Sequence, residues 1–219
     1  MVKRLFDITA STFLLLILLP IFLPIMLVLR FTGEGEVFYF QTRIGRGRKS
    51  IKIFKFATML KNSELTGSGI YTAKNDPRIL PVGAFLRRTK INELPQIVNV
   101  LIGDLSMVGP RPLIERTFNL YSEDTKLKIS SLKPGLTGIG SLIFRDEESI
   151  LFNTDLPLEE FYKEFISPYK GSLEVWYKDN QSFFTDLKII ILTAWIIFFP
   201  SSNLIEYIFT DLPKKEISN

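Results

Sequence analysis

The chain has 219 residues, which is enough for one domain with a sizeable core and a membrane element. It contains no histidine and no cysteine, so histidine acid–base catalysis, cysteine nucleophiles, disulfides and Cys/His zinc sites are excluded. Any metal must be held by oxygen ligands, which indicates Mg²⁺-like chemistry. The net charge of +4 fits anionic partners such as phosphates, nucleotides or lipid headgroups, although ordinary surface lysines and arginines explain it equally well.

The first long feature is an apolar segment over residues 8–29, which Arg30 follows. Its length is near the ~20 residues that cross a bilayer. The segment is long for a cleaved signal peptide, and no small-residue cleavage site follows it. Pro20 and Pro24 each remove a helical hydrogen bond, and cations flank both ends. These features favour a re-entrant helix over residues 1–31, which breaks at the prolines and returns to the same face, over a simple spanning helix.

Two strands are predicted after a glycine-rich turn at residues 33–36. Val37–Gln41 is rich in aromatic and β-branched residues and Ser50–Phe56 alternates, so the two segments predict a hairpin. The basic turn Arg43–Lys49 between them is either a phosphate or headgroup patch or an ordinary solvated loop. Residues 60–80 are polar and predict a loop.

A short helix is predicted at Val82–Thr89, and an apolar-periodic helix is predicted at Glu93–Leu101 with Pro95 in its first turn. Asn92 is the expected N-cap of this second helix. Glu93 then lies in the first turn, where the helix dipole favours an anion.

Two charged features follow. Arg111 lies between Pro110 and Pro112, and an arginine held in this way beside a carboxylate is suited to bind phosphate oxygens. The alternative is an exposed arginine in a proline-bounded connector. The cluster Arg145–Glu148 is either a source of a metal ligand or base, or a solvated helix start.

The second half of the chain predicts mostly helices. An amphipathic helix is expected at Glu115–Ile129, and Lys133–Ser141 is a glycine-rich loop too unspecific to assign to phosphate binding. Leu158–Gln181 is expected to be helical, with an interruption between Pro168 and Gly171, and its many aromatic residues suit a membrane interface. Phe183–Phe199 predicts an interfacial or core helix.

Several segments, in this order along most of the chain, resemble the bacterial sugar transferases. These are the small membrane phosphoglycosyl transferases that start polysaccharide and glycoconjugate assembly. The matching segments are Lys3–Asp7, Val37–Gly45, Lys55–Met59, Asn75–Arg78, Phe85–Thr89, Glu93–Gln96, Asn99–Pro112 and Pro134–Gly138.

The resemblance implies an α/β, helix-rich, membrane-associated catalytic domain with interfacial helices over residues 32–219, on a re-entrant helix over residues 1–31. It implies a monotopic protein on the cytoplasmic face of the bacterial inner membrane. The implied reaction moves a sugar 1-phosphate from a UDP-sugar to a polyprenyl phosphate with Mg²⁺ or Mn²⁺, releasing UMP, in polysaccharide or lipopolysaccharide biosynthesis. The implied partners are a nucleotide sugar, a polyprenyl phosphate or lipid-linked glycan, and membrane lipids. No nucleic acid partner is predicted, and a homodimer is left open.

In this family an Asp-Glu pair carries the reaction, and its aspartate attacks the phosphate nearest the sugar. Here the position of the aspartate is occupied by Asn92, while Glu93 retains the residue usually linked to Mg²⁺. The resemblance therefore makes Glu93, Asn92 and Arg111 the candidate catalytic residues, with Glu93 as the metal ligand. The candidate phosphate-binding residues are Lys55, Arg78, Arg87, Arg88 and Arg111.

Three positions depart from the family pattern: Asn92, Ala57 in place of an arginine, and Leu23 in place of the serine before Pro24. Asn92 matters most, because a neutral amide is a poor nucleophile and cannot form a stable acyl phosphate. Four interpretations remain open. The chain transfers a glycosyl group without a phospho-enzyme, or it transfers a phosphosugar directly or through Glu93. Otherwise Asn92 was introduced to trap a complex, or the chain is a non-catalytic homologue that binds a lipid-linked glycan.

Overall fold

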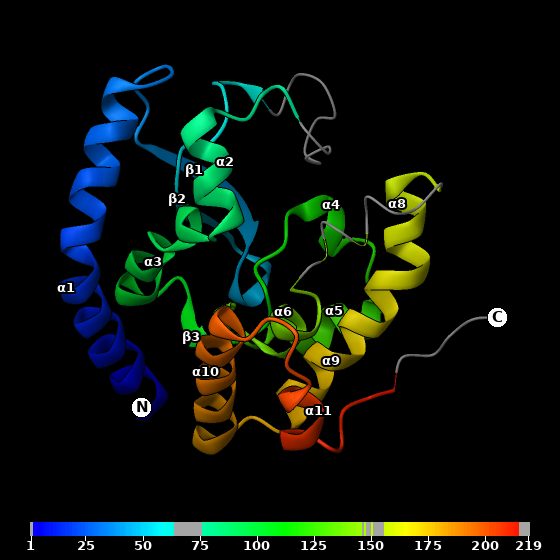
Figure 1. The fold of residues 1–219 in the computed structure, drawn as a ribbon. Coiled ribbons are helices and arrows are strands. Elements are labelled where there is room, and N and C mark those ends of the chain that lie inside the picture. Colours follow the sequence, from blue (N-terminus) through cyan, green and yellow to red (C-terminus); the bar gives the residue numbers. More distant parts are fainter. Residues whose placement is uncertain (1, 64–75, 146, 148–149, 151–155, 215–219) are drawn as a thin grey trace.

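The computed structural model describes residues 2–63, 76–145, 147, 150 and 156–214, and it confirms the mixed, helix-rich class (Figure 1). The helices are α1 (Val2–Phe31), α2 (Pro81–Arg88), α3 (Gln96–Ile102), α4 (Glu115–Phe118), α5 (Glu123–Ser130), α6 (Ile139–Ile143), α8 (Leu158–Phe161), α9 (Ser167–Asp179), α10 (Phe183–Phe198) and α11 (Leu204–Ile208). The strands are β1 (Phe38–Ile44), β2 (Ser50–Phe56), β3 (Ser106–Val108) and β4 (Gly135–Thr137). They form two small sheets, β1–β2 and β3–β4.

Helix α1 continues through Pro20 and Pro24 as one element, where the sequence predicts a break. Each proline removes one hydrogen bond and bends the axis, but the helical turns on either side are retained. At ~1.5 Å per residue the helix is about 45 Å long, which exceeds the ~30 Å hydrocarbon core of a bilayer. By length and composition, α1 is able to span a membrane.

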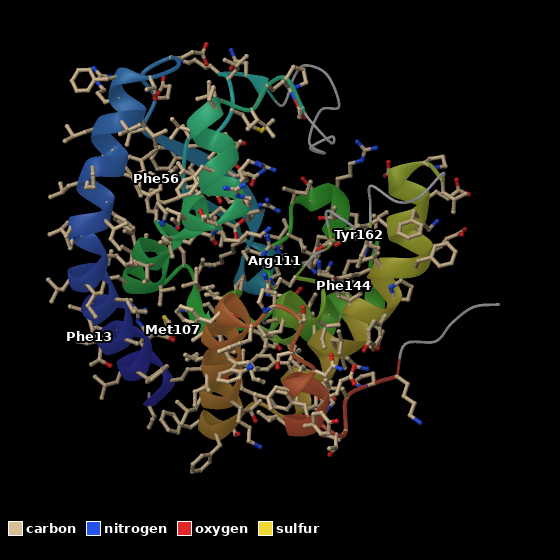
Figure 2. The ribbon with its side chains drawn as sticks, in the orientation of Figure 1. Phe13, Phe56, Met107, Arg111, Phe144 and Tyr162 are labelled. Atoms are coloured by element: carbon tan, nitrogen blue, oxygen red, sulfur yellow. The ribbon has the colours of Figure 1, made fainter. Side chains whose placement is uncertain are left out.

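One stripe of α1 packs against the rest of the protein along nearly the whole helix. In Figure 1 this helix, in blue, runs along one side of the domain. The packed side chains are Phe6, Ala10, Leu14, Leu15, Leu18, Phe22, Ile25, Met26 and Leu29. Their spacing of three to four residues places them on one helical face. The opposite face is apolar and exposed from Val2 (73 % exposed) to Phe31 (84 % exposed), and Phe13 points away from the domain in Figure 2.

Polar side chains fasten the first two turns of α1 to the domain. The guanidinium of Arg4 donates to the carbonyls of Val100 and Leu101 at 2.7 Å each, at the carboxyl end of α3 where a cation is favourable. The buried carboxylate of Asp7 accepts a hydrogen bond from the Met107 N–H at 2.9 Å. Helix α1 is therefore connected directly to α3 and β3.

The predicted hairpin is confirmed, with β1 and β2 antiparallel and Phe38 opposite Phe56. The second edge of β2 is covered by the buried side chain of Asn99. Its amide oxygen accepts from the Phe54 N–H at 2.9 Å, and its amide nitrogen donates to the Lys52 carbonyl at 2.7 Å. Asn99 thus replaces a third strand at this edge and joins α3 to β2.

The segment Lys133–Ser141 was predicted to be a loop, and this prediction is wrong. The segment contains β4 and the start of α6. Strand β4 runs parallel to β3, and the two backbones approach closely at glycines. A Cβ atom on Gly138 would lie 2.1 Å from the carbonyl oxygen of Gly109. Glycine permits two backbones to approach this closely, so the glycines of this segment allow the strands to pair. The sequence does not show which distant segment they meet.

The short helix predicted before Lys90 is confirmed as α2. The single helix predicted over Glu115–Ile129 is wrong, because α4 and α5 are separate and the Ser122 hydroxyl caps α5 by accepting from the Thr125 N–H at 3.2 Å.

The long helical region after Leu158 is also corrected. It has no interruption between Pro168 and Gly171, where α9 is continuous. The irregular part is a π-helical stretch at Tyr162–Ile166, just before Pro168. Pro168 has no N–H and therefore cannot donate to the α-helical hydrogen-bond pattern. Helix α10 buries one face in the core, which agrees with the interfacial or core helix predicted.

Replacing Gly138 with alanine is predicted to destabilise the fold by about 1–3 kcal/mol, because backbone must shift to accept the methyl group. Urea unfolding in detergent micelles followed by circular dichroism measures this. Gly171→Ala is the control, because its Cβ would meet a Thr125 side chain at 3.1 Å and alanine favours the helix. Equal unfolding midpoints for the two variants would contradict the prediction.

Candidate active site

The centre of the candidate site is the carboxylate of Glu93, which contacts two cations. Its Oε1 lies 3.1 Å from Nζ of Lys55 and 3.4 Å from a guanidinium nitrogen of Arg111. All three side chains are partly shielded from solvent, and Figure 2 shows Arg111 in the middle of the molecule, between α2 and α9. Three residues predicted from sequence are thus brought together from three distant segments.

Three pieces of backbone position this cluster. Lys55 lies on β2, directly after Phe54, whose N–H is held by Asn99 of α3. Glu93 ends a 3-10 turn that leads into the same α3. Arg111 follows β3, so the β3–β4 pairing and the Asn99 side chain together determine the distances between the three charges.

The electrostatics favour an ionised carboxylate. Burial alone would raise the pKa of Glu93, but Lys55 and Arg111 hold that pKa well below its ordinary value. Burial lowers the pKa of Lys55 to about 8, even though Glu93 opposes the shift. Arg43 acts on Lys55 and Lys90 acts on Glu93, so two further cations lie around this pair. An excess of positive charge suits a ligand with several negative charges, such as a diphosphate.

Two of these cations were not among the predicted site residues. Arg43 holds the Arg111-bearing segment by donating to the Pro112 carbonyl at 3.4 Å. Lys90 has φ of 59°, in the left-handed region that usually favours glycine after a helix. A lysine in place of glycine in this conformation, beside the other cations, indicates a functional position. Only the backbone geometry shows this.

Asn92 does not cap a helix, so this prediction is wrong. It lies in the separate 3-10 turn Ile91–Glu93, in which the Leu94 N–H donates to the Ile91 carbonyl at 3.1 Å. Helix α3 begins only after Pro95. Asn92 is 6 % exposed, and its Oδ1 has no hydrogen-bond partner among the described residues. An unsatisfied buried oxygen next to Glu93 in sequence is a marked feature of the site.

The other predicted phosphate-binding cations have contacts of their own. The guanidinium of Arg78 is buried and paired with Asp76 at 2.6 Å, and it also donates to the Ser63 carbonyl. Arg87 lies at the end of α2 with one nitrogen 3.9 Å from the Met59 sulfur, and Arg88 next to it is exposed. The motif residue Asn75 lies outside the described residues.

A second polar layer, also not predicted, lies behind Arg111 on α9. The carboxyl of Glu174 accepts from the Arg111 N–H at 3.4 Å. One turn earlier, the buried Lys170 ammonium pairs with Glu147 at 2.5 Å. Glu147 belongs to the charged cluster Arg145–Glu148 named in the sequence analysis, and in the structure it pairs with Lys170. Asp146 and Glu148 of that cluster lie outside the described residues.

A divalent metal is compatible with these residues. Among the described residues no group of three or more acidic side chains gathers to form a complete metal cage. Mg²⁺ commonly takes only one or two carboxylates and completes its shell with water and substrate phosphates. The Glu93 carboxylate and the unpartnered Oδ1 of Asn92 are hard oxygen donors of the required kind.

Comparison with known proteins gives matches over most of the chain. Residues 1–200 match the family described as bacterial sugar transferase. The chain is 32 % identical to the exopolysaccharide production protein ExoY of Rhizobium meliloti over 207 residues, which cover 88 % of this chain and 84 % of that protein. It is 38 % identical to the uncharacterized sugar transferase EpsL of Bacillus subtilis over 192 residues, covering 88 % and 85 %.

A longer relative is the UDP-glucose:undecaprenyl-phosphate glucose-1-phosphate transferase of Escherichia coli. The identity is 34 % over 200 residues, which cover 89 % of this chain and 40 % of that protein. These matches include the segments that carry Lys55, Glu93 and Arg111. This chain therefore belongs to the bacterial sugar transferase family.

Proposed function

We propose that this chain transfers a sugar 1-phosphate from a UDP-sugar to a polyprenyl phosphate at a membrane surface, in polysaccharide assembly. The observation that carries the proposal is the Lys55–Glu93–Arg111 cluster, in which cations outnumber the carboxylate. The names of two relatives support it: an undecaprenyl-phosphate galactose phosphotransferase from Salmonella typhimurium and the glucose-1-phosphate transferase from Escherichia coli.

We assign the attack to the acceptor, because Asn92 offers no carboxylate to attack phosphorus. An oxygen of the polyprenyl phosphate is already ionised and needs no base. The new bond joins this oxygen to the phosphorus nearest the sugar. The bond from that phosphorus to the UMP oxygen breaks, and UMP leaves with the electron pair. The transfer is then direct and passes through no covalent enzyme intermediate.

The cations bind and orient the two phosphate-bearing substrates. Lys55 and Arg111, with Arg43 and Lys90 nearby, neutralise the charge that develops on the oxygens of the transferring phosphoryl group. Glu93 keeps Lys55 and Arg111 in place, and its carboxylate is the proposed protein ligand of Mg²⁺ or Mn²⁺. When bound, such an ion would add positive charge at the diphosphate.

We further propose a monotopic position on the cytoplasmic face of the inner membrane. Both halves of α1 pack on the same domain, its first turns through Arg4 and Asp7 and its last turns through Leu29. A helix held in this way keeps both ends on one side of the bilayer while its exposed apolar face meets lipid. Exposed aromatic residues at the start of α10, next to Phe6, extend that face.

Asn92 favours a second candidate, glycosyl transfer from the nucleotide sugar, which needs no phospho-enzyme. The two reactions differ in their products, because phosphoglycosyl transfer releases UMP and glycosyl transfer releases UDP. Purified protein with undecaprenyl phosphate, Mg²⁺ and a panel of UDP-sugars distinguishes them. Release of neither nucleotide, with ligand binding retained, would support a non-catalytic binding protein.

Glu93→Gln is predicted to lower UMP release by about 100-fold or more, because it removes the charge that organises Lys55 and Arg111. The same assay with Glu159→Gln, a carboxylate paired with Arg116 at the surface, is expected to match the unchanged protein. Equal rates for both variants would reject a role for Glu93.

Asn92→Asp is predicted to restore the covalent route. In the presence of a UDP-sugar and the absence of acceptor, intact mass spectrometry should show a phosphosugar adduct on the variant and none on the unchanged protein. An adduct on the unchanged protein would refute direct transfer and would identify another nucleophile.

The membrane position predicts that both ends of α1 face the cytoplasm. The chain has no cysteine, so a cysteine added before Met1 and Glu34→Cys, just beyond the other end of α1, each give a single label site. A membrane-impermeant maleimide should label both in inverted vesicles and neither in intact spheroplasts. Labelling of either position from outside would exclude the monotopic arrangement.

A further inference from the structure

We propose that Glu174 is a positioning residue for Arg111: from α9 it holds the Arg111 peptide and thereby determines where the guanidinium meets Glu93. This inference concerns a residue that reaches the Glu93 cluster through the backbone of Arg111. The activity measurement below rests on the proposed function, whereas the spectroscopic measurement does not.

The geometry places the carboxyl of Glu174 directly behind the site. Glu174 is 2 % exposed, and its Oε1 accepts from the Arg111 N–H at 3.4 Å. On its other side the carboxyl meets the backbone of α6, where a Cβ atom on Gly140 would lie only 2.3 Å from Oε1. Glycine at this position therefore makes room for the carboxyl that reaches Arg111.

The neighbours of Arg111 show why this one peptide needs support. Pro110 and Pro112 on either side have no N–H, so neither can donate a backbone hydrogen bond to hold this segment. Arg43 binds the carbonyl of Pro112 at 3.4 Å, and Gly135 donates to the carbonyl of Pro110 at 2.8 Å. The Arg111 N–H is the donor between these two points, and Glu174 accepts from it.

Stability alone does not explain a carboxyl at this position. Its second oxygen, Oε2, is buried and has no hydrogen-bond partner among the described residues. Lys170, the cation that most lowers the pKa of Glu174, is itself paired with Glu147 at 2.5 Å and donates to the Tyr162 hydroxyl at 3.4 Å. A buried carboxyl with one oxygen unsatisfied is unfavourable compared with an apolar residue of similar size. Its contact with the Arg111 peptide supplies a reason for its presence.

The surroundings make this contact sensitive to pH. Burial raises the pKa of Glu174 to about 7, although Lys170 and the Arg111 N–H oppose the shift. The charged and titratable groups around it are Lys170, Glu147, Arg111, Tyr121, Tyr162 and Tyr177. Because a carboxylate accepts a stronger hydrogen bond than a neutral carboxyl, Arg111 is held more firmly above about pH 7 than below it.

The direct test observes the Arg111 amide by nuclear magnetic resonance. Carbonyl-labelled proline combined with amide-labelled arginine selects arginines that follow proline, and the sequence has two, Arg78 and Arg111. The Arg111 signal is expected to titrate with a midpoint near pH 7 and to stop titrating in Glu174→Gln. The Arg78 amide, which donates to Asp76 at 3.0 Å, is the internal control and is expected to stay in place.

The functional test compares three variants in the UMP-release assay across pH. Glu174→Ala is expected to lower kcat/KM by about 10- to 100-fold, because small displacements of a positioned group have effects of this size. Glu174→Gln, which keeps the accepting oxygen, is expected to recover part of that loss and to lack the rise in kcat/KM through pH 7. Glu123→Gln, an exposed carboxylate on α5, is the control expected to match the unchanged protein.

The outcomes separate the two proposals. An Arg111 signal that does not titrate, or that titrates equally in Glu174→Gln, would overturn the role of Glu174 whatever the activity. An Arg111 signal that titrates as expected in a protein inactive on every UDP-sugar would uphold the contact and reject the proposed function. A Glu174→Gln variant that is stable to urea but retains the pH-dependent rise would also overturn the positioning role.

Discussion

The side-chain amide of Asn99 is the interaction on which the site geometry depends. It is fully buried, and it satisfies one donor and one acceptor on the edge of β2 that no strand covers. Removing it would leave both backbone groups unpaired in the core, which costs about 1–3 kcal/mol for each such group. Because Lys55 follows this edge and Glu93 precedes α3, the same amide determines how close the ammonium and the carboxylate can lie.

The opposite end of the same helix meets α1. Arg4 binds the last carbonyls of α3, and Asp7 binds the start of β3, the strand that leads to Arg111. The two halves of the active site are therefore tied to the first turns of an apolar helix. The first turns of α1 are thus linked directly to the segments that hold the Glu93 cluster.

Much of the local structure could be predicted from sequence. Alternation and turn residues predicted the β1–β2 hairpin. The family motifs made Lys55, Glu93 and Arg111 candidate site residues, and the structure brings the three side chains into contact. The N-cap role of Asn92 was wrong because residues 91–93 close a separate 3-10 turn, and α3 begins only after Pro95. The β3–β4 sheet and the Glu174 layer were not predicted, because both depend on glycine backbones meeting segments far away in the chain.

The sequence by itself determined the chemistry available to this protein. Histidine and cysteine are absent and Asn92 stands where the family has its aspartate, so the polar chemistry of the chain is left to carboxylates, lysines, arginines, amides and hydroxyls. Only the tertiary structure decided which of them meet. Local periodicity specifies helices and strands, but it contains no information on which cation finds which carboxylate. Long-range contacts decided that Arg78 pairs with Asp76, while Lys55 and Arg111 share Glu93 and Glu174 supports Arg111 from behind.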